Sequence, residues 1–276
     1  MVRISDGMNS IRTTNHASRT MFVVSRFTLH CLVVGLVLAF HTNVWATSPQ
    51  IELSEPLLDR PGLVHSTAFF GAVAGSKVYD TAGSLGTTFQ LGKQKSGRFY
   101  FFGDIFTWIK NMSGTSFEPK RITYTLETGY AIENEGNRTR IFIKHQSFHN
   151  VDFVDGPRES YELYGVSYQW LKKPDIYLSV GNYLNKKNVD YTWDLVASAT
   201  IDLKSIEGHD TYLHVWLHRV TESGNIRDGF TDYAGELGVH LSPAVTAFGR
   251  YELLNDIDHF KGTADHHTMI GIRYQW

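Results

Sequence analysis

The feature that most constrains the fold is a repeated run, about ten residues long, in which apolar and polar side chains alternate. Across residues 121–132 one row of alternate positions is mostly apolar and consists of Ile122, Tyr124, Leu126, Thr128, Tyr130 and Ile132. Residues 191–204 and 211–220 repeat this pattern. Successive side chains of a strand point to opposite faces, so this period of two predicts an all-β fold.

The chain contains twelve such runs, an even number, as bacterial single-chain β-barrels have. The expected strands are residues 64–74, 83–93, 97–109, 120–133, 138–148, 158–170, 175–184, 189–204, 210–221, 230–241, 244–254 and 265–276. Their connections alternate in length, with tight turns such as 134–137 and 242–243 and longer segments such as 110–119 and 255–264. Short periplasmic turns opposite longer external loops are typical of a membrane barrel.

Alternation alone fits either a secreted β-sandwich or a membrane β-barrel, and the aromatic residues favour the barrel. Aromatic pairs lie near the ends of expected strands, where interfacial girdles form: Tyr124 and Tyr130, Tyr191 and Trp193, Tyr274 and Trp276. The chain ends in IGIRYQW, and this terminal aromatic after alternate apolar residues resembles the C-terminal signal by which outer-membrane proteins are recognised for insertion. We therefore predict a transmembrane antiparallel up-and-down β-barrel in the bacterial outer membrane. Its last strand, ending at Trp276, would contact the barrel assembly machinery.

The N-terminal region reads as a secretory signal peptide. Arg19 and Arg26 precede a continuous apolar run over 31–40, and Val44-Trp45-Ala46 offers a cleavage site. The run is too short for a spanning helix, which needs about 20 residues, and this disfavours the alternative of a membrane anchor. We expect an N-terminal extension and signal peptide over 1–46, a periplasmic segment over 47–63 and the barrel over 64–276. Met21 lies at the usual distance from the apolar run, so residues 1–20 fit an over-extended start.

Composition excludes several classes of function. The single cysteine, Cys31, lies in the segment to be removed, so the mature chain has no disulfide or thiol chemistry. Removing 1–46 takes four Arg and one Asp from the 26 basic and 28 acidic residues, which leaves a net charge of −5. Such a chain lacks the basic patch of a nucleic-acid binder. No later stretch reaches 18 apolar residues, so no transmembrane helix is expected.

One segment, residues 143–164, carries candidate catalytic residues. His145 and Ser147 are two residues apart and therefore share a face, which also carries Ile141 and Ile143 and is expected to contact lipid. Glu159 begins the next strand across a short loop, within reach of His145. A serine hydroxyl becomes a nucleophile when an imidazole takes its proton, and a carboxylate orients that imidazole. At the outer-leaflet level such a triad would meet the ester bonds of outer-membrane lipids.

The same residues resemble the active-site segment of the lipid A 3-O-deacylases (PagL family). The shared pattern is His-x-Ser, with a Glu twelve residues after the Ser within Asp-Gly-x-x-Glu-Ser-Tyr. The outer-membrane phospholipase A family has a similar His-x-Ser with Asn at the place of the Glu, and twelve strands with a mid-chain site are closer to its layout. The resemblance implies an esterase with Ser147 as nucleophile, His145 as base and Glu159 as orienting acid. Both families have Asn directly after the Ser, whereas this chain has Phe148.

Two other interpretations of this segment stay open. The three residues also fit ordinary polar positions at a barrel rim. Alternatively, His145, His149 and Asp152 could hold a divalent metal if the chain turns between them, and Asp152 with Asp155 could bind calcium. The calcium dependence of the phospholipase family adds weight to the second site.

The inward rows allow a different function. They carry charges of both signs: Arg121, Glu127, Asp194, Asp202, His214, His218, Glu236, His240, Arg250, Glu252 and Arg273. Such residues line a water-filled pore or pair into a closed interior. The stretch 99–106 (FYFFGDIF) resembles nucleoside-channel barrels of the Tsx type. The alternative to an esterase is therefore a non-enzymatic, porin-like channel.

Overall fold

The computed structural model describes residues 62–76, 79–94, 97–110, 119–150, 159–187, 189–224, 226, 229–255 and 265–276. The expected signal peptide and the segment that follows it, up to residue 61, lie outside this range. No helix of the described part is long and apolar enough to cross a membrane.

The prediction of twelve strands is confirmed, and most strand ends lie within two residues of the expected ones. The strands are β1 (Gly62–Ala74), β2 (Thr81–Gln94), β3 (Gly97–Ile109), β4 (Pro119–Asn134), β5 (Asn137–Asn150), β6 (Glu159–Trp170), β7 (Asp175–Lys187), β8 (Tyr191–Ile206), β9 (His209–Glu222), β10 (Phe230–Ser242), β11 (Val245–Leu254) and β12 (Asp265–Gln275). All pair antiparallel, each with its neighbours in the sequence.

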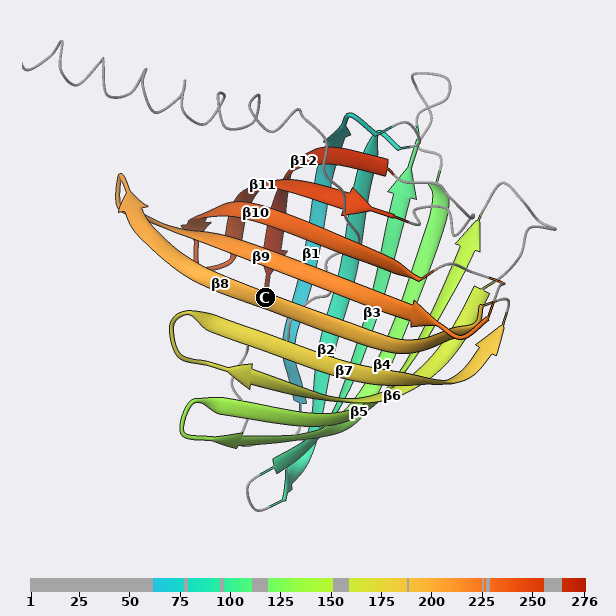
Figure 1. Ribbon diagram of the computed structural model, residues 1–276. Helices are drawn as coiled ribbons and strands as arrows, with labels where there is room; N and C mark the ends of the chain where they lie inside the picture. The colour runs from blue at the N-terminus through green and yellow to red at the C-terminus, as the bar shows by residue number, and fades with distance from the viewer. Residues whose placement is uncertain are drawn as a thin grey trace, which may run out of the picture. The chain divides into compact units, whose positions relative to one another are not determined.

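The sheet closes into a barrel because β1 also pairs with β12. The ribbons of these two strands lie side by side in Figure 1. The register runs from Thr67 opposite Gln275 to Ala74 opposite Thr268. At the end of the chain, Ser66 and Trp276 exchange two backbone hydrogen bonds of 2.9 and 3.0 Å. The terminal aromatic residue therefore completes the ring of strands, as the sequence predicts.

Tight turns join the strands at the end of the barrel where β1 begins and β12 ends. The β4–β5 turn has φ angles of 39° at Glu135 and 90° at Gly136, and the β8–β9 turn has 52° at Glu207 and 86° at Gly208. Two successive positive φ values are typical of the two-residue hairpin turn whose twist matches that of the strands. A glycine at the second position relieves the strain that a side chain would meet there. These turns mark the periplasmic end.

The two faces of the sheet have opposite chemistry. Large apolar side chains on the outside are strongly exposed, as in Ile141 (62%), Phe70 (55%) and Ile272 (57%). Charged side chains on the inside, such as Arg250 and Glu236, are buried. A water-soluble sandwich would show the reverse, and an apolar surface this extensive is stable only against hydrocarbon. The chain is an outer-membrane β-barrel.

One local detail, at the start of β8, differs from the sequence analysis. The pairing of β8 with β9 shifts register between Tyr191 and Asp194, and Tyr191 lies in the interior, 1% exposed, rather than in a girdle. The β8–β9 hairpin also extends past the end of the β7 pairing, which stops at Asp175 opposite Thr200 (Figure 1). Asp202 lies in this extension, in the same row as Tyr212 opposite it, and pairs with Lys173.

Candidate active site

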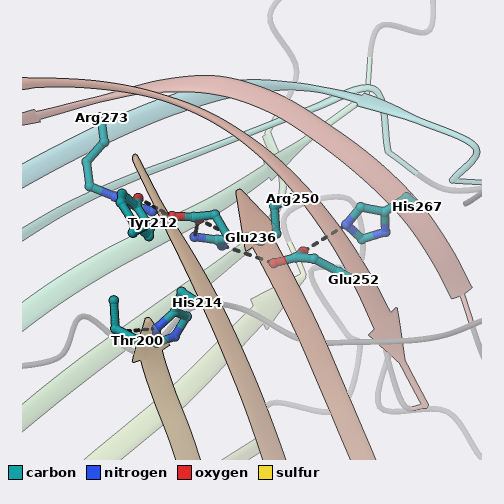
Figure 2. A network of polar contacts seen from close by, with 8 residues as sticks. All are labelled: Thr200, Tyr212, His214, Glu236, Arg250, Glu252, His267 and Arg273. Carbon is teal, nitrogen blue, oxygen red and sulfur yellow. Dashed lines mark hydrogen bonds and ion pairs between the residues drawn. The ribbon is translucent and has the colours of Figure 1, made fainter. Parts of the chain in front are cut away.

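Inside the barrel, β9 to β12 carry a network of charged side chains (Figure 2). Arg250 donates from Nε to Glu236 at 2.7 Å and from Nη1 to Glu252 at 3.0 Å. Glu236 also accepts hydrogen bonds from Arg273 at 2.8 Å and from the Tyr212 hydroxyl at 2.6 Å. Charges enclosed in this way are satisfied by one another, which is the arrangement of a structural network rather than of a binding surface.

Two contacts of this network join strands that are not neighbours in the ring. Arg273 on β12 donates to Tyr212 on β9 at 2.9 Å. The ring of His267, also on β12, lies edge-on to Trp108 on β3 at 5.2 Å, although β1 and β2 separate the two strands. His267 also contacts Glu252 on the adjacent β11 at 2.9 Å. The network therefore links β12 to strands on both sides of it.

The interior beside β5 to β10 is packed as well. His218 contacts Asp194 at 3.0 Å, and the Tyr183 hydroxyl donates to Asp194 at 3.1 Å. Around them lies a buried cluster that is mostly aromatic: Tyr100, Phe102, Ala131, Phe142, Tyr161, Leu163, Tyr183, Val189, Tyr191, Val220 and Phe230. The predicted lumen charges are thus mainly paired and enclosed, as in the closed-interior alternative.

On the outside of the barrel, β5 carries the predicted base in the row that includes Thr139, Ile141 and Ile143. Ile141 and Ile143 are 62% and 54% exposed, which confirms that this row faces outward. His145 follows two residues later, and its Nδ1 lies 3.1 Å from Oε1 of Glu162 on β6. The side chains of His145 and Glu162 are 37% and 35% exposed. An imidazole paired with a carboxylate thus sits on the face that meets lipid.

Ser147 lies on the same face as His145, one step further toward the external end of β5. Two residues along a strand correspond to roughly 7 Å. Its Cα partners across the sheet are Tyr124 on β4 and Ser160 on β6, and its side chain is half-buried. The structure therefore places the predicted nucleophile and base together on one outward patch, with Ser160 directly across from Ser147.

Glu159, the predicted acid, lies opposite Phe148 in the register, one position out of phase with the row of His145. Its side chain is not among those described. The carboxylate that the structure places beside the imidazole belongs to Glu162, a residue that the sequence analysis missed. The signal was present in β6, where Glu162 continues the outward apolar row of Tyr164, Val166 and Tyr168 at every second position.

The metal candidates are only partly described. Asp152 and Asp155 lie outside the described residues, so calcium binding there stays a prediction. His149 packs edge-on against Tyr124, with ring centroids 5.3 Å apart. Within the described ranges, no group of three His, Cys, Asp or Glu side chains is placed to hold a metal ion.

No protein-family model and no curated protein matches the sequence. Several solved structures match the fold. An active-site mutant of outer membrane phospholipase A from Escherichia coli aligns at a TM-score of 0.54 with 8% identity, over 81% of this chain and 94% of that one. The calcium-bound dimer of the outer membrane phospholipase from Salmonella typhi aligns at 0.54 with 7% identity, over 77% and 92%. Salmonella typhi OmpF in complex with daunomycin aligns at 0.41 with 10% identity, over 80% and 100%. At such low identities the likeness to the phospholipases shows the fold alone.

Proposed function

We propose that this barrel is an esterase that hydrolyses acyl esters of outer-membrane lipids, phospholipid or lipid A, with Ser147 as nucleophile and His145 as base. The observation that carries the proposal is the contact of His145 Nδ1 with a carboxylate, at 3.1 Å, on the lipid-facing side of the barrel. A polar group on that face is energetically unfavourable, because hydrocarbon offers it no hydrogen bonds. Its presence there therefore favours a functional role.

The chemistry needs one proton carrier and one nucleophile. With Nδ1 engaged by the carboxylate, Nε2 is the nitrogen that accepts the proton of Ser147 Oγ as this oxygen attacks the ester carbonyl. The lipid alkoxide leaves with that proton, and the acyl group stays on the serine. Water then attacks the acyl-enzyme and gives a proton to His145. The bond between the acyl group and the serine oxygen breaks, the fatty acid leaves, and the serine oxygen takes that proton from His145.

The position of the site selects the substrate. Tight turns define the periplasmic end of the barrel, and His145 lies eight residues up β5 from Asn137, at the β4–β5 turn. At about 3.3 Å per residue and a tilt near 45°, this is roughly 20 Å above the turn, in the outer half of a bilayer. The nearer boundary of the hydrocarbon, where the acyl esters lie, is therefore that of the outer leaflet, and its lipids reach the site from the membrane.

A channel is the alternative, and the interior argues against it. Passive flow needs a water-filled lumen, whereas most of the inward charges described above are buried and bonded to one another. The fold is compatible with an esterase, because outer membrane phospholipase A, whose name states its activity, has a similar fold.

The proposal is tested by Ser147→Ala in the purified mature barrel, folded into vesicles that contain phospholipid and lipid A. Released acyl chains are identified by mass spectrometry, with added calcium and with a chelator. We expect release to fall about 10⁴-fold or more, because without the nucleophile only residual binding effects act.

Ser160→Ala is the matched control, since Ser160 lies directly across from Ser147 on the same face. Its rate is expected within about threefold of the unaltered barrel, in keeping with the small effect of most surface substitutions. Equal rates for Ser147→Ala and the unaltered protein would refute the esterase.

A further inference from the structure

We infer that Glu162, rather than Glu159, is the carboxylate that orients His145. The inference rests on the proposed esterase function and names a further positioning residue in that site. Glu162 would contact the imidazole and not the ester group that is hydrolysed.

The first argument is the register of the β5–β6 hairpin. The pairing runs from Asn137 opposite Trp170 to Phe148 opposite Glu159 without a shift. Residues directly opposite in an antiparallel pair share a face. His145 is opposite Glu162, so their side chains share the outward face, while Glu159 falls in the row of Phe148.

The second argument is the geometry of the contact itself. A distance of 3.1 Å between Nδ1 and Oε1 is within hydrogen-bond range. With Nδ1–H donating to Glu162, the ring has a fixed tautomer and a fixed plane, and Nε2 is left as the acceptor. This is the state that a general base for a serine needs.

The third argument concerns the surroundings of Glu162. Its outward neighbours along β6 are Ser160 and Tyr164, the latter 49% exposed, Val166 follows in the same row, and Leu126 lies across from His145 on β4. A carboxylate among lipid-facing apolar side chains has little water to solvate it. In such surroundings its attraction to a protonated imidazole is stronger than in water. The site therefore stabilises the imidazolium that forms when His145 takes the serine proton.

The test compares Glu162→Gln with Glu159→Gln in the full mature barrel folded into vesicles. Gln keeps the size and a hydrogen-bond acceptor but removes the charge. We expect Glu162→Gln to lower kcat about 10²-fold to 10⁴-fold with little change in KM, because it weakens stabilisation of the transition state rather than binding. Glu159→Gln is expected within about threefold of the unaltered barrel.

Rescue by a conservative variant separates a positioning role from a structural one. Glu162→Asp restores the charge one methylene shorter and is expected to recover part of the kcat that Glu162→Gln loses. A purely structural role would leave both variants equally active per folded barrel.

The outcomes distinguish the inference from the function it rests on. Loss of activity in Glu159→Gln with near-normal kcat in Glu162→Gln would overturn the role of Glu162 and leave the esterase standing. Hydrolysis that Ser147→Ala does not affect would remove the esterase itself. Folding of each variant is followed by the heat-dependent gel mobility of barrels. If Glu162→Gln fails to fold, partial activity of Glu162→Asp with full activity of Glu159→Gln supports the inference, whereas an inactive Glu159→Gln refutes it.

Discussion

The lumen network and the outer patch use the same kinds of side chain in opposite surroundings. In the lumen, Glu236 is 2% exposed and is held by both Arg250 and Arg273. On the outer face, Glu162 is 35% exposed and contacts one imidazole, at the border of an apolar surface. A carboxylate enclosed by two cations holds strands together, whereas one that is paired with a single histidine beside lipid is available for chemistry. The comparison predicts that changes in the lumen alter stability and changes on the outer patch alter activity.

The largest effect is expected at the outer patch. His145→Asn removes the base and keeps a polar side chain, so lipid hydrolysis should fall about 10⁴-fold, equivalent to roughly 5 kcal/mol of transition-state stabilisation. The free energy of unfolding, measured with urea in vesicles, should stay within about 0.5 kcal/mol of the unaltered value, since the side chain is half-exposed. A variant that unfolds easily but still hydrolyses lipid would make the His145–Glu162 contact structural and break the comparison.

The next effect is expected in the lumen. Arg250→Met leaves Glu236 and Glu252 without one of their cationic partners inside the barrel. Removing one member of a buried ion pair typically costs about 3–5 kcal/mol, and we expect the free energy of unfolding to fall by about that amount. Activity per folded barrel should change by less than about threefold.

The exposed pair of Lys173 and Asp202 provides a control for Arg250→Met. These side chains are 78% and 46% exposed, and such pairs contribute about 0–1 kcal/mol. Lys173→Met should therefore leave the urea midpoint almost unchanged. Similar losses in both variants would show that enclosure is not what makes the lumen network stabilising.

A smaller change sharpens the same point. Tyr212→Phe keeps the ring and removes the hydroxyl that donates to Glu236 at 2.6 Å and accepts from Arg273 at 2.9 Å. Hydrogen bonds to charged groups contribute about 1.5–3 kcal/mol, so unfolding should become easier by that amount. The measurement is again urea unfolding in vesicles, with lipid hydrolysis unchanged. Full stability of Tyr212→Phe would mean that the two charges satisfy each other without the phenol.

The strands could be predicted from sequence because each one contacts two different environments, one on each face. Lipid on one side and a polar interior on the other force a period of two, and residues 97–109, for example, were expected and found as Gly97–Ile109. The same parity placed His145 and Ser147 on the outward face. The assignment of faces from this alternation fails at the start of β8, where the register shifts before Asp194, because one extra residue reverses the faces.

The pairings between strands could not be predicted in the same way. Choosing between Glu159 and Glu162 requires the register of β5 on β6, and the intervening loop allows more than one alignment. In the lumen, Arg273 and Tyr212 are 61 residues apart in sequence and meet only because the barrel curves back on itself. Alternation says which face a residue occupies, whereas closure of the barrel decides what it meets there.

The bond between Ser66 and Trp276 also makes closure of the barrel depend on the two strands that are farthest apart in the sequence. Every other pairing joins strands that follow each other in the chain, whereas β1 has β12 as its second neighbour. Without β12, β1 and β11 present unsatisfied edges that can add foreign strands. A chain shortened before Asp265 would keep those edges permanently, and aggregation would then compete with insertion at every stage.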